Sequence, residues 1–481
     1  MDFFSWSPRE YTAQVYDLRA GSSIPQILAA YGSAQPQVLR SVLAQAIRLG
    51  AQMCVVEYRY IDQDYRDEHS RFYSTTFRRY PSVAHRLHFF EEPPPAELFD
   101  PDRPLRQFND LHYLGYSVLR PVAGGPVGRT MLRVTDDLEP YVPCVSSDSV
   151  NLLGRQLTVS RATPFMAQDA QLSRCAHTTV WTTAYYHHLR FRADRKLPGD
   201  IVDAAPSGMG VGRRVPSAGL SIYQLTEAFS QVDLPCLVYQ VNDLPPSEDV
   251  HSVVCRYLNS GLPVTVAAGG HAFVLIGYRT HASPGEPTTF EYIRQDDEVG
   301  PYQLVPEWRL DDYRPWQFLI VPLPRKVYVA GEKAEVIGGQ YIQAALARES
   351  TPECAALSKR IEAQEVSLRS TLRLSNEFKC ELDHRGTPPE LAALYERMSM
   401  SRWIWVVEAT DRSSRNAGEP CVLAEAIIDA TDHLRDLHAL AWRIPGRLFR
   451  WDPDWNAVGS RKMPDIPPLR SCSLVSSVAL P

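Results

Sequence analysis

The most informative stretch of the sequence is residues 168–178, Gln168-Asp169-Ala170-Gln171-Leu172-Ser173-Arg174-Cys175-Ala176-His177-Thr178. Beyond it, apolar side chains recur at helical spacing, at Val180, Trp181, Ala184, Tyr185 and Leu189. This spacing predicts a helix that is capped by Ser173 and has Cys175 in its first turn. The helix dipole and the unpaired amides of that turn favour a thiolate. Cys175 is therefore a candidate nucleophile.

A second stretch predicts a histidine at the start of an apolar strand. Residues 269–278 are Gly269-Gly270-His271-Ala272-Phe273-Val274-Leu275-Ile276-Gly277-Tyr278, and they follow a turn and strand over residues 259–266. A side chain at a strand end is held rigidly and can still face a cleft. His271 is therefore a candidate base for the Cys175 thiol.

A third stretch is typical of a strand that ends in carboxylates, Phe290-Glu291-Tyr292-Ile293-Arg294-Gln295-Asp296-Asp297. Asp296 would accept the second ring proton of His271, which fixes the tautomer and stabilises the imidazolium. Asp296 is favoured by its position at the strand end, and Asp297 remains an alternative.

Acyl transfer by a thiol also needs hydrogen-bond donors for the oxyanion that forms. Gln168 is the natural side-chain donor, and the backbone N–H of Cys175 would be the second.

The order of these motifs resembles that of papain-like cysteine peptidases: Gln, Cys at a helix start, Gly-x-Pro-Val, His on a strand, and Asp on the next strand. It is most similar to the bacteriocin-processing family, which cleaves double-glycine leaders, and to its free-standing bacterial relatives. The likeness covers only the middle third of the chain, chiefly residues 163–169 and 270–278.

The resemblance implies Gln168 as oxyanion residue, Cys175 as nucleophile, His271 as base and Asp296 as orienting residue. The spacing from Gln to Cys differs slightly from that of the exporter domains, so Gln171 stays an alternative to Gln168. The family usually has Gly after the Cys, where this chain has Ala176.

Length and composition indicate a globular protein of several domains. A chain of 481 residues exceeds what one hydrophobic core usually serves, and it is 44% hydrophobic and 22% charged. The net charge of −6 argues against a partner such as nucleic acid or an anionic membrane. No apolar run is long enough to cross a bilayer.

Nine scattered cysteines without a CxxC pair argue against a disulfide framework and a thiolate zinc site. No metal or other cofactor is expected. No secretory signal is visible at the N-terminus, so a cytoplasmic location is expected.

The fold class is predicted to be α+β, with a papain-like central domain in which the nucleophile helix packs on an antiparallel sheet. The predicted domains are an N-terminal α+β accessory domain (1–158), the papain-like domain (159–326) and a C-terminal α/β accessory domain (327–481). Helices are expected over 38–47, 340–348 and much of 354–373. Strands are expected over 55–61, 113–120, 130–134, 152–159, 403–409 and 422–429.

The expected function is hydrolysis of a peptide bond in a polypeptide substrate through a Cys175 acyl-enzyme. Two alternatives remain open. One is an acyltransferase or transglutaminase-type enzyme, in which an amine replaces water. The other is a catalytically silent papain-like scaffold that binds a protein partner through its large flanking domains.

Overall fold

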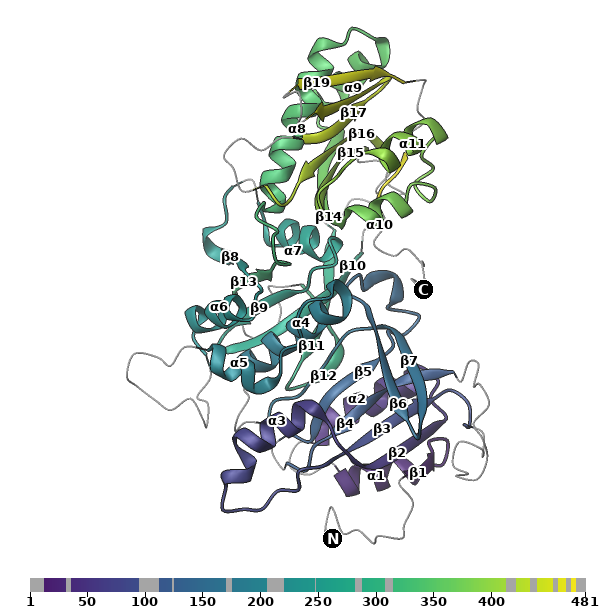
Figure 1. The fold of residues 1–481 in the computed structure, drawn as a ribbon, viewed down its shortest axis with the longest axis vertical. Coiled ribbons are helices and arrows are strands. Elements are labelled where there is room, and N and C mark those ends of the chain that lie inside the picture. Colours follow the sequence, from purple (N-terminus) through teal and green to yellow (C-terminus); the bar gives the residue numbers. More distant parts are fainter. Residues whose placement is uncertain are drawn as a thin grey trace. The chain divides into compact units, whose positions relative to one another are not determined.

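The computed structural model describes residues 13–31, 36–94, 112–122, 125–169, 175–205, 220–246, 248–281, 288–307, 315–411, 421–432, 439–452, 457–463 and 469–472. It confirms the α+β class, with helices packed on several antiparallel sheets (Figure 1). By its internal contacts the chain forms two units, Met1–Val250 with Leu262–Pro324, and His251–Gly261 with Arg325–Pro481. The domain boundaries expected at 158/159 and 326/327 stay predictions.

The first unit begins with a five-stranded antiparallel sheet in the order β1-β2-β3-β4-β5. Its strands are β1 (Ala13–Asp17), β2 (Met53–Tyr60), β3 (Ala84–Phe90), β4 (Tyr113–Leu119) and β5 (Val127–Leu132). Three helices accompany them, α1 (Ser23–Tyr31), α2 (Pro36–Arg48) and α3 (Gln63–Arg71). The helix expected over 38–47 is confirmed as α2, whose Val38, Leu39, Val42, Leu43 and Ala46 are buried.

The single strand expected over 152–159 is wrong, because the chain forms the hairpin β6 (Ser146–Leu152) and β7 (Arg155–Ala162) there. Leu153 and Gly154 both adopt positive φ, 48° and 81°. The Gly154 amide donates to the Asn151 side chain at 2.9 Å. This side-chain contact supports a tight turn between the two strands.

A six-stranded antiparallel sheet follows, in the order β12-β11-β10-β9-β13-β8. Its strands are β8 (Cys236–Gln240), β9 (Val264–Ala268), β10 (His271–His281), β11 (Thr289–Asp296), β12 (Gly300–Val305) and β13 (Trp316–Pro322). Helix α4 (Cys175–Phe191) packs against β10, with α5 (Pro198–Ala204) and α6 (Ile222–Gln231) nearby (Figure 1).

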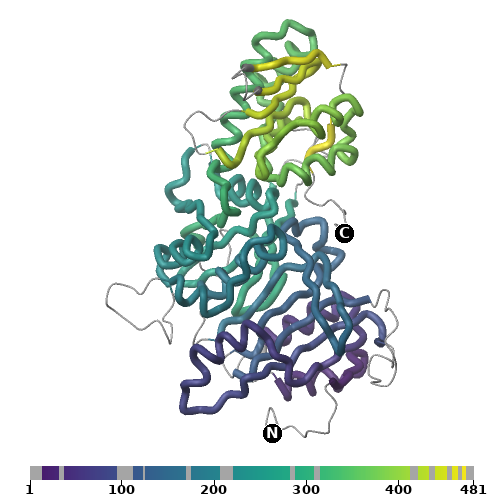
Figure 2. The backbone as a smooth tube through the Cα atoms, in the orientation of Figure 1, coloured from purple at the N-terminus to yellow at the C-terminus, as the bar shows by residue number. Residues whose placement is uncertain are grey.

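One hydrophobic core joins the two sheets of this unit. Val55 and Tyr116 of the five-stranded sheet belong to the same buried cluster as Trp181 of α4 and Ile320 of β13 in the six-stranded sheet. In agreement with this shared core, the strands drawn purple to blue lie beside the elements drawn teal (Figure 2). Burial of this apolar surface therefore stabilises both sheets together.

The second unit has a seven-stranded antiparallel sheet, β14-β15-β16-β17-β18-β19, with β20 paired to β16. Its elements are α7 (Val250–Asn259), α8 (Gly331–Arg348), α9 (Pro352–Glu362), β14 (Val366–Leu374), α10 (Ser375–Cys380), α11 (Pro389–Arg397), β15 (Trp403–Asp411), β16 (Cys421–Asp429), β17 (Ala439–Ile444), β18 (Arg447–Asp452), β19 (Ala457–Lys462) and β20 (Leu469–Arg470). Gly338 brings α8 close to the sheet, since a Cβ there would lie 2.8 Å from Val407.

The helix expected over much of 354–373 is right only as far as Glu362. The chain turns at Gln364, which has a positive φ of 57°, and then pairs with β15 as β14. Pairing along the whole of β14 overrides the local helical pattern. Among the described helices, none is both long and apolar enough to span a membrane.

Candidate active site

Cys175 is the first residue of α4, and its side chain is half-buried. The next twelve residues of the helix are buried, so Cys175 is more accessible than the part of the helix that directly follows it. Ser173, the expected cap, and Gln171, the alternative donor, lie outside the described residues.

The tight turn before His271 sets the position of this residue at the start of β10. Ala268 at the end of β9 pairs with His271 at the start of β10, which leaves only Gly269 and Gly270 to reverse the chain. Both glycines adopt positive φ, 55° and 83°. Two-residue hairpin turns of this kind require φ above zero at both positions, which glycine tolerates best. The turn thus fixes the backbone position from which the His271 side chain extends.

Asp296 ends β11 next to His271, as the sequence predicts. His271 Nε2 donates to Asp296 Oδ1 at 3.1 Å. The same carboxylate accepts the Glu298 amide at 3.1 Å, and its other oxygen lies 3.3 Å from Arg294 Nε. The alternative, Asp297, lies farther away, with Oδ1 3.9 Å from His271 Nε2.

Cys175 lies near the same imidazole. Burial lowers the pKa of His271, but the hydrogen bond to Asp296, the Cys175 side chain and the charges of Asp296 and Asp297 outweigh it and raise the pKa to about 10. Nδ1 is buried and has no hydrogen-bond partner among the described residues. Since Nε2 is engaged by Asp296, Nδ1 is the nitrogen left for the thiol. At neutral pH an imidazolium therefore lies near the sulfur.

The two adjacent aspartates are in opposite protonation states. Burial opposes ionisation of Asp296, yet the hydrogen bond and charge of His271 and the charge of Arg294 lower its pKa below the usual range. Burial raises the pKa of Asp297 to about 8, and repulsion from Asp296 and Glu298 adds to the rise. At neutral pH, Asp296 is therefore a carboxylate and Asp297 largely a neutral acid.

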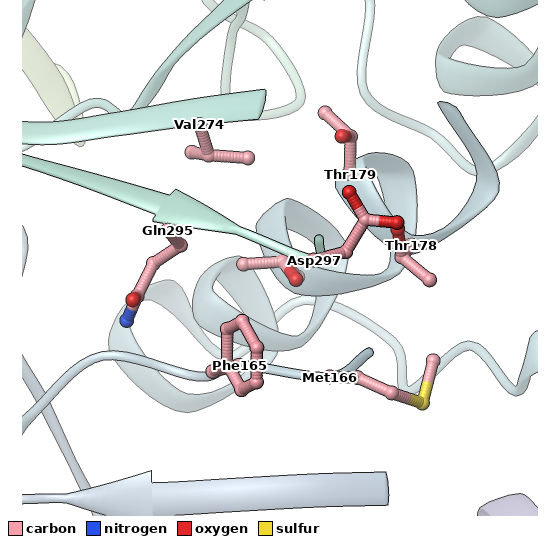
Figure 3. Close-up of a pocket in the computed structure, with 8 residues that line it drawn as sticks. Phe165, Met166, Thr178, Thr179, Val274, Gln295 and Asp297 are labelled. Carbon is pink, nitrogen blue, oxygen red and sulfur yellow. The ribbon is translucent and has the colours of Figure 1, made fainter. Parts of the chain in front are cut away.

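Asp297 lines a small pocket between α4 and the six-stranded sheet. Figure 3 shows its carboxyl group directed toward Thr178 and Thr179 of α4. The lining residues are Phe165, Met166, Thr178, Thr179, Thr182, Val274, Gln295 and Asp297. Neither Cys175 nor His271 is among them, so the pocket adjoins the candidate triad and does not contain it.

Gln168 lies on the same side of the imidazole as the thiol partner. Its Nε2 donates to Glu298 Oε1 at 3.4 Å, and that oxygen lies 3.8 Å from His271 Nδ1. The structure thus brings together Cys175, His271, Asp296 and Gln168. Glu298 was not predicted, although it directly follows Asp296 and Asp297 in the acidic end of the strand.

His271, Asp296 and Asp297 could also hold a metal ion, because one donor atom from each lies within 4.8 Å of the others. Imidazole and carboxylate are ligands that divalent cations accept. In this structure, however, Asp296 is already bonded to His271 and lies beside Arg294. The geometry therefore fits a carboxylate, Asp296, that is ion-paired and orients the His271 ring.

No protein-family model matches the chain, and no curated protein matches its sequence. The interpretation of the site therefore rests on the geometry of Cys175, His271, Asp296 and Gln168.

Proposed function

We propose that this protein is a papain-like cysteine peptidase that hydrolyses a peptide bond through an acyl-enzyme on Cys175. The observation that supports this most is the position of one imidazole between two partners. The Cys175 side chain acts on the pKa of His271, and Nε2 of the same ring donates to Asp296 at 3.1 Å. A thiol, a base and an orienting carboxylate in this order match the requirements of thiol acyl transfer.

In the proposed first half-reaction, the Cys175 thiolate attacks the peptide carbonyl carbon and a C–S bond forms. The carbonyl oxygen becomes an oxyanion, stabilised by the Gln168 amide and the backbone N–H of Cys175. The His271 imidazolium then gives its proton to the leaving nitrogen as the C–N bond breaks. An amine departs and a thioester remains on the sulfur.

In the second half-reaction, water attacks the thioester while neutral His271 takes one of its protons. The C–S bond breaks, the carboxylic acid leaves, and the thiolate–imidazolium pair is restored. Asp296 stays ionised throughout and keeps the ring oriented.

The surrounding fold supports the same proposal. The candidate nucleophile opens α4, and the candidate base and orienting residue lie on β10 and β11 of the antiparallel sheet against which this helix packs. We propose a polypeptide substrate, a bacterial cytoplasmic setting, and a protein partner for the parts of the chain outside the middle third.

Site-resolved alkylation of the full-length protein tests the proposal. The protein is treated with iodoacetamide at pH 7, and each cysteine is followed by mass spectrometry. Cys175 is expected to react at least about tenfold faster than Cys380, which is exposed. The His271→Ala variant is expected to lose that advantage. A Cys175 no faster than Cys380 in the wild type would contradict the proposal.

Fluorescein-labelled casein, with Cys175→Ala as the blank, then reports hydrolysis. Addition of a primary amine such as cadaverine separates the candidate reactions. Incorporation of the amine in place of hydrolysis would identify an acyltransferase.

A further inference from the structure

The segment that bears Gln168 is bound to the five-stranded sheet. Thr130 of β5 exchanges two backbone hydrogen bonds with Phe165, at 2.8 and 3.0 Å, and the Ala167 amide donates to Val127 at 3.1 Å. The candidate oxyanion donor therefore follows directly from a segment aligned along β5. Cys175, His271 and Asp296 instead belong to α4 and the six-stranded sheet.

Arg120 is the buried centre of this attachment. Its Nη2 donates to the carbonyl oxygens of Gly125 at 2.8 Å, Val127 at 3.2 Å and Ala167 at 2.8 Å. Its Nη1 bonds both oxygens of Glu68 in α3, at 2.7 and 3.0 Å. The guanidinium is planar and rigid, so these contacts fix the peptide that directly precedes Gln168.

The residue after Gln168 is held from the same side. Asp169 is buried, and the hydroxyl of Tyr73, which follows α3, donates to its Oδ2. Gln168 thus has a fixed neighbour in each direction along the chain.

Gly125 determines how closely the β4–β5 connection approaches Gln168. A Cβ at Gly125 would lie 1.9 Å from the Gln168 carbonyl oxygen and 2.8 Å from its carbonyl carbon. No heavy atom can occupy that place unless the Gln168 peptide moves. This close approach is the constraint at Gly125.

We propose that Arg120 and Gly125 are positioning residues for the Gln168 oxyanion donor, so that the five-stranded sheet is part of the catalytic apparatus. The inference rests on the proposed function. A donor shifted by about 1 Å loses much of its effect on an oxyanion, about 100-fold in rate. The thiol–imidazole–carboxylate set takes no atoms from this sheet, so displacement of Gln168 should leave the reactivity of the thiol unchanged.

Two probes separate these effects in the full-length protein. p-Nitrophenyl acetate acylates the sulfur through an oxyanion and releases a burst of p-nitrophenol. Iodoacetamide alkylates the same sulfur by displacement of iodide and forms no oxyanion. In Gly125→Ala we expect the burst rate to fall about 10- to 100-fold, while alkylation of Cys175 stays within about twofold of wild type.

The matched control is Gly21→Ala, because a Cβ at Gly21 meets no atom within 4 Å. It should change neither rate. Gln168→Ala should lower the burst rate as Gly125→Ala does, and the double variant should show no further loss, because both changes remove one donor. Arg120→Lys provides a second test if Gly125→Ala does not fold, since it keeps the charge beside Glu68 and loses the three-carbonyl contact.

The outcomes distinguish the inference from the proposed function. A wild-type burst rate in Gly125→Ala, together with a reduced rate in Gln168→Ala, overturns the inference alone. A parallel loss of both rates in Gly125→Ala also overturns it, because the effect would then be on the fold as a whole. Slow alkylation of wild-type Cys175 removes the proposed function itself.

Discussion

His271 Nε2 donates to Asp296 at 3.1 Å, while the neighbouring Asp297 lies 3.9 Å from the same nitrogen. The two adjacent carboxyl groups therefore interact unequally with the His271 imidazole. The difference supports the proposed orienting role for Asp296 and not for Asp297. Substitutions at the two positions should differ in effect accordingly.

Asp296→Asn should slow alkylation of Cys175 at pH 7 by at least about tenfold, because the His271 imidazolium loses its carboxylate partner. Asp297→Asn should leave the rate within about threefold, since a neutral acid is replaced by a neutral amide of similar shape. Site-resolved mass spectrometry measures both rates. Equal losses in the two variants would contradict the assignment of Asp296.

Asp297→Asn should stabilise the protein at pH 8, by about 1–3 kcal/mol. The pKa of Asp297 is raised to about 8 in the folded state, so stability is largest below the unfolded pKa near 3.8 and falls as pH rises toward 8. Asn carries no charge and removes this loss. Urea unfolding at pH 5 and pH 8 measures the difference, and an unchanged pH dependence in the variant would argue against a neutral Asp297.

The pH dependence of hydrolysis should have its alkaline limb near pH 10. The pKa of His271 is raised to about 10 in the folded state, so the imidazolium needed to protonate the leaving amine persists to that pH. The same shift stabilises the folded state fully below about pH 6.5, and this contribution is lost as pH rises through about 10. Casein hydrolysis between pH 6 and 11 tests the limb, and a fall centred near pH 7 would contradict it.

Glu298→Gln tests whether the Glu298 carboxylate holds Gln168, the proposed oxyanion donor, in the absence of substrate. Gln168 Nε2 donates to Glu298 Oε1 at 3.4 Å, and the Glu298 side chain is 45% exposed. Removal of its charge should release the donor and raise the p-nitrophenyl acetate burst rate about two- to fivefold, because an ion-assisted hydrogen bond is replaced by a weaker neutral one. Stability should change by less than about 0.5 kcal/mol. A tenfold lower rate would instead make Glu298 a required residue.

The second unit offers a stability prediction of its own. Glu425 is fully buried and bonds Arg385 at 2.6 Å, Arg443 at 3.2 Å and the Tyr395 hydroxyl at 2.7 Å. Despite burial, these partners lower the pKa of Glu425 to about 2. Glu425→Ala should destabilise this unit by about 3–5 kcal/mol, because the buried Arg443 guanidinium loses its partner Glu425 and Arg385 keeps only Glu408.

Thermal unfolding of the full chain measures the effect of Glu425→Ala. The control is Glu365→Ala, whose side chain is 58% exposed and pairs with Arg360 at the surface. It should change stability by less than about 1 kcal/mol. In the wild type, the contribution of Glu425 is present above pH 4.5 and is lost as pH falls toward 2.

The candidate site could be predicted where its residues follow local rules. A cysteine at a helix start, a histidine after a glycine pair and an aspartate at a strand end are all visible in short windows of sequence. The structure brings these three together with Gln168. Their catalytic roles remain proposals.

Other features depend on contacts between residues distant in sequence. Arg120 meets Ala167 across 47 positions, and no local pattern predicts that pairing. The neutral state of Asp297 follows from burial, which its carboxylate chemistry does not suggest. The helical pattern also fails over β14, because this strand is formed by pairing with β15. The first residue of β15 lies 37 positions after the first residue of β14.

The order of strands in the six-stranded sheet has a consequence for synthesis of the chain. β13, the last of its strands to be made, is inserted between β9 and β8. The sheet that supports His271 is therefore incomplete until the ribosome has passed Pro322, 147 residues after Cys175 (322 − 175). At about 5–20 residues per second this takes about 7–30 s. During that interval the nascent thiol lacks its finished support and is open to oxidants and chaperones.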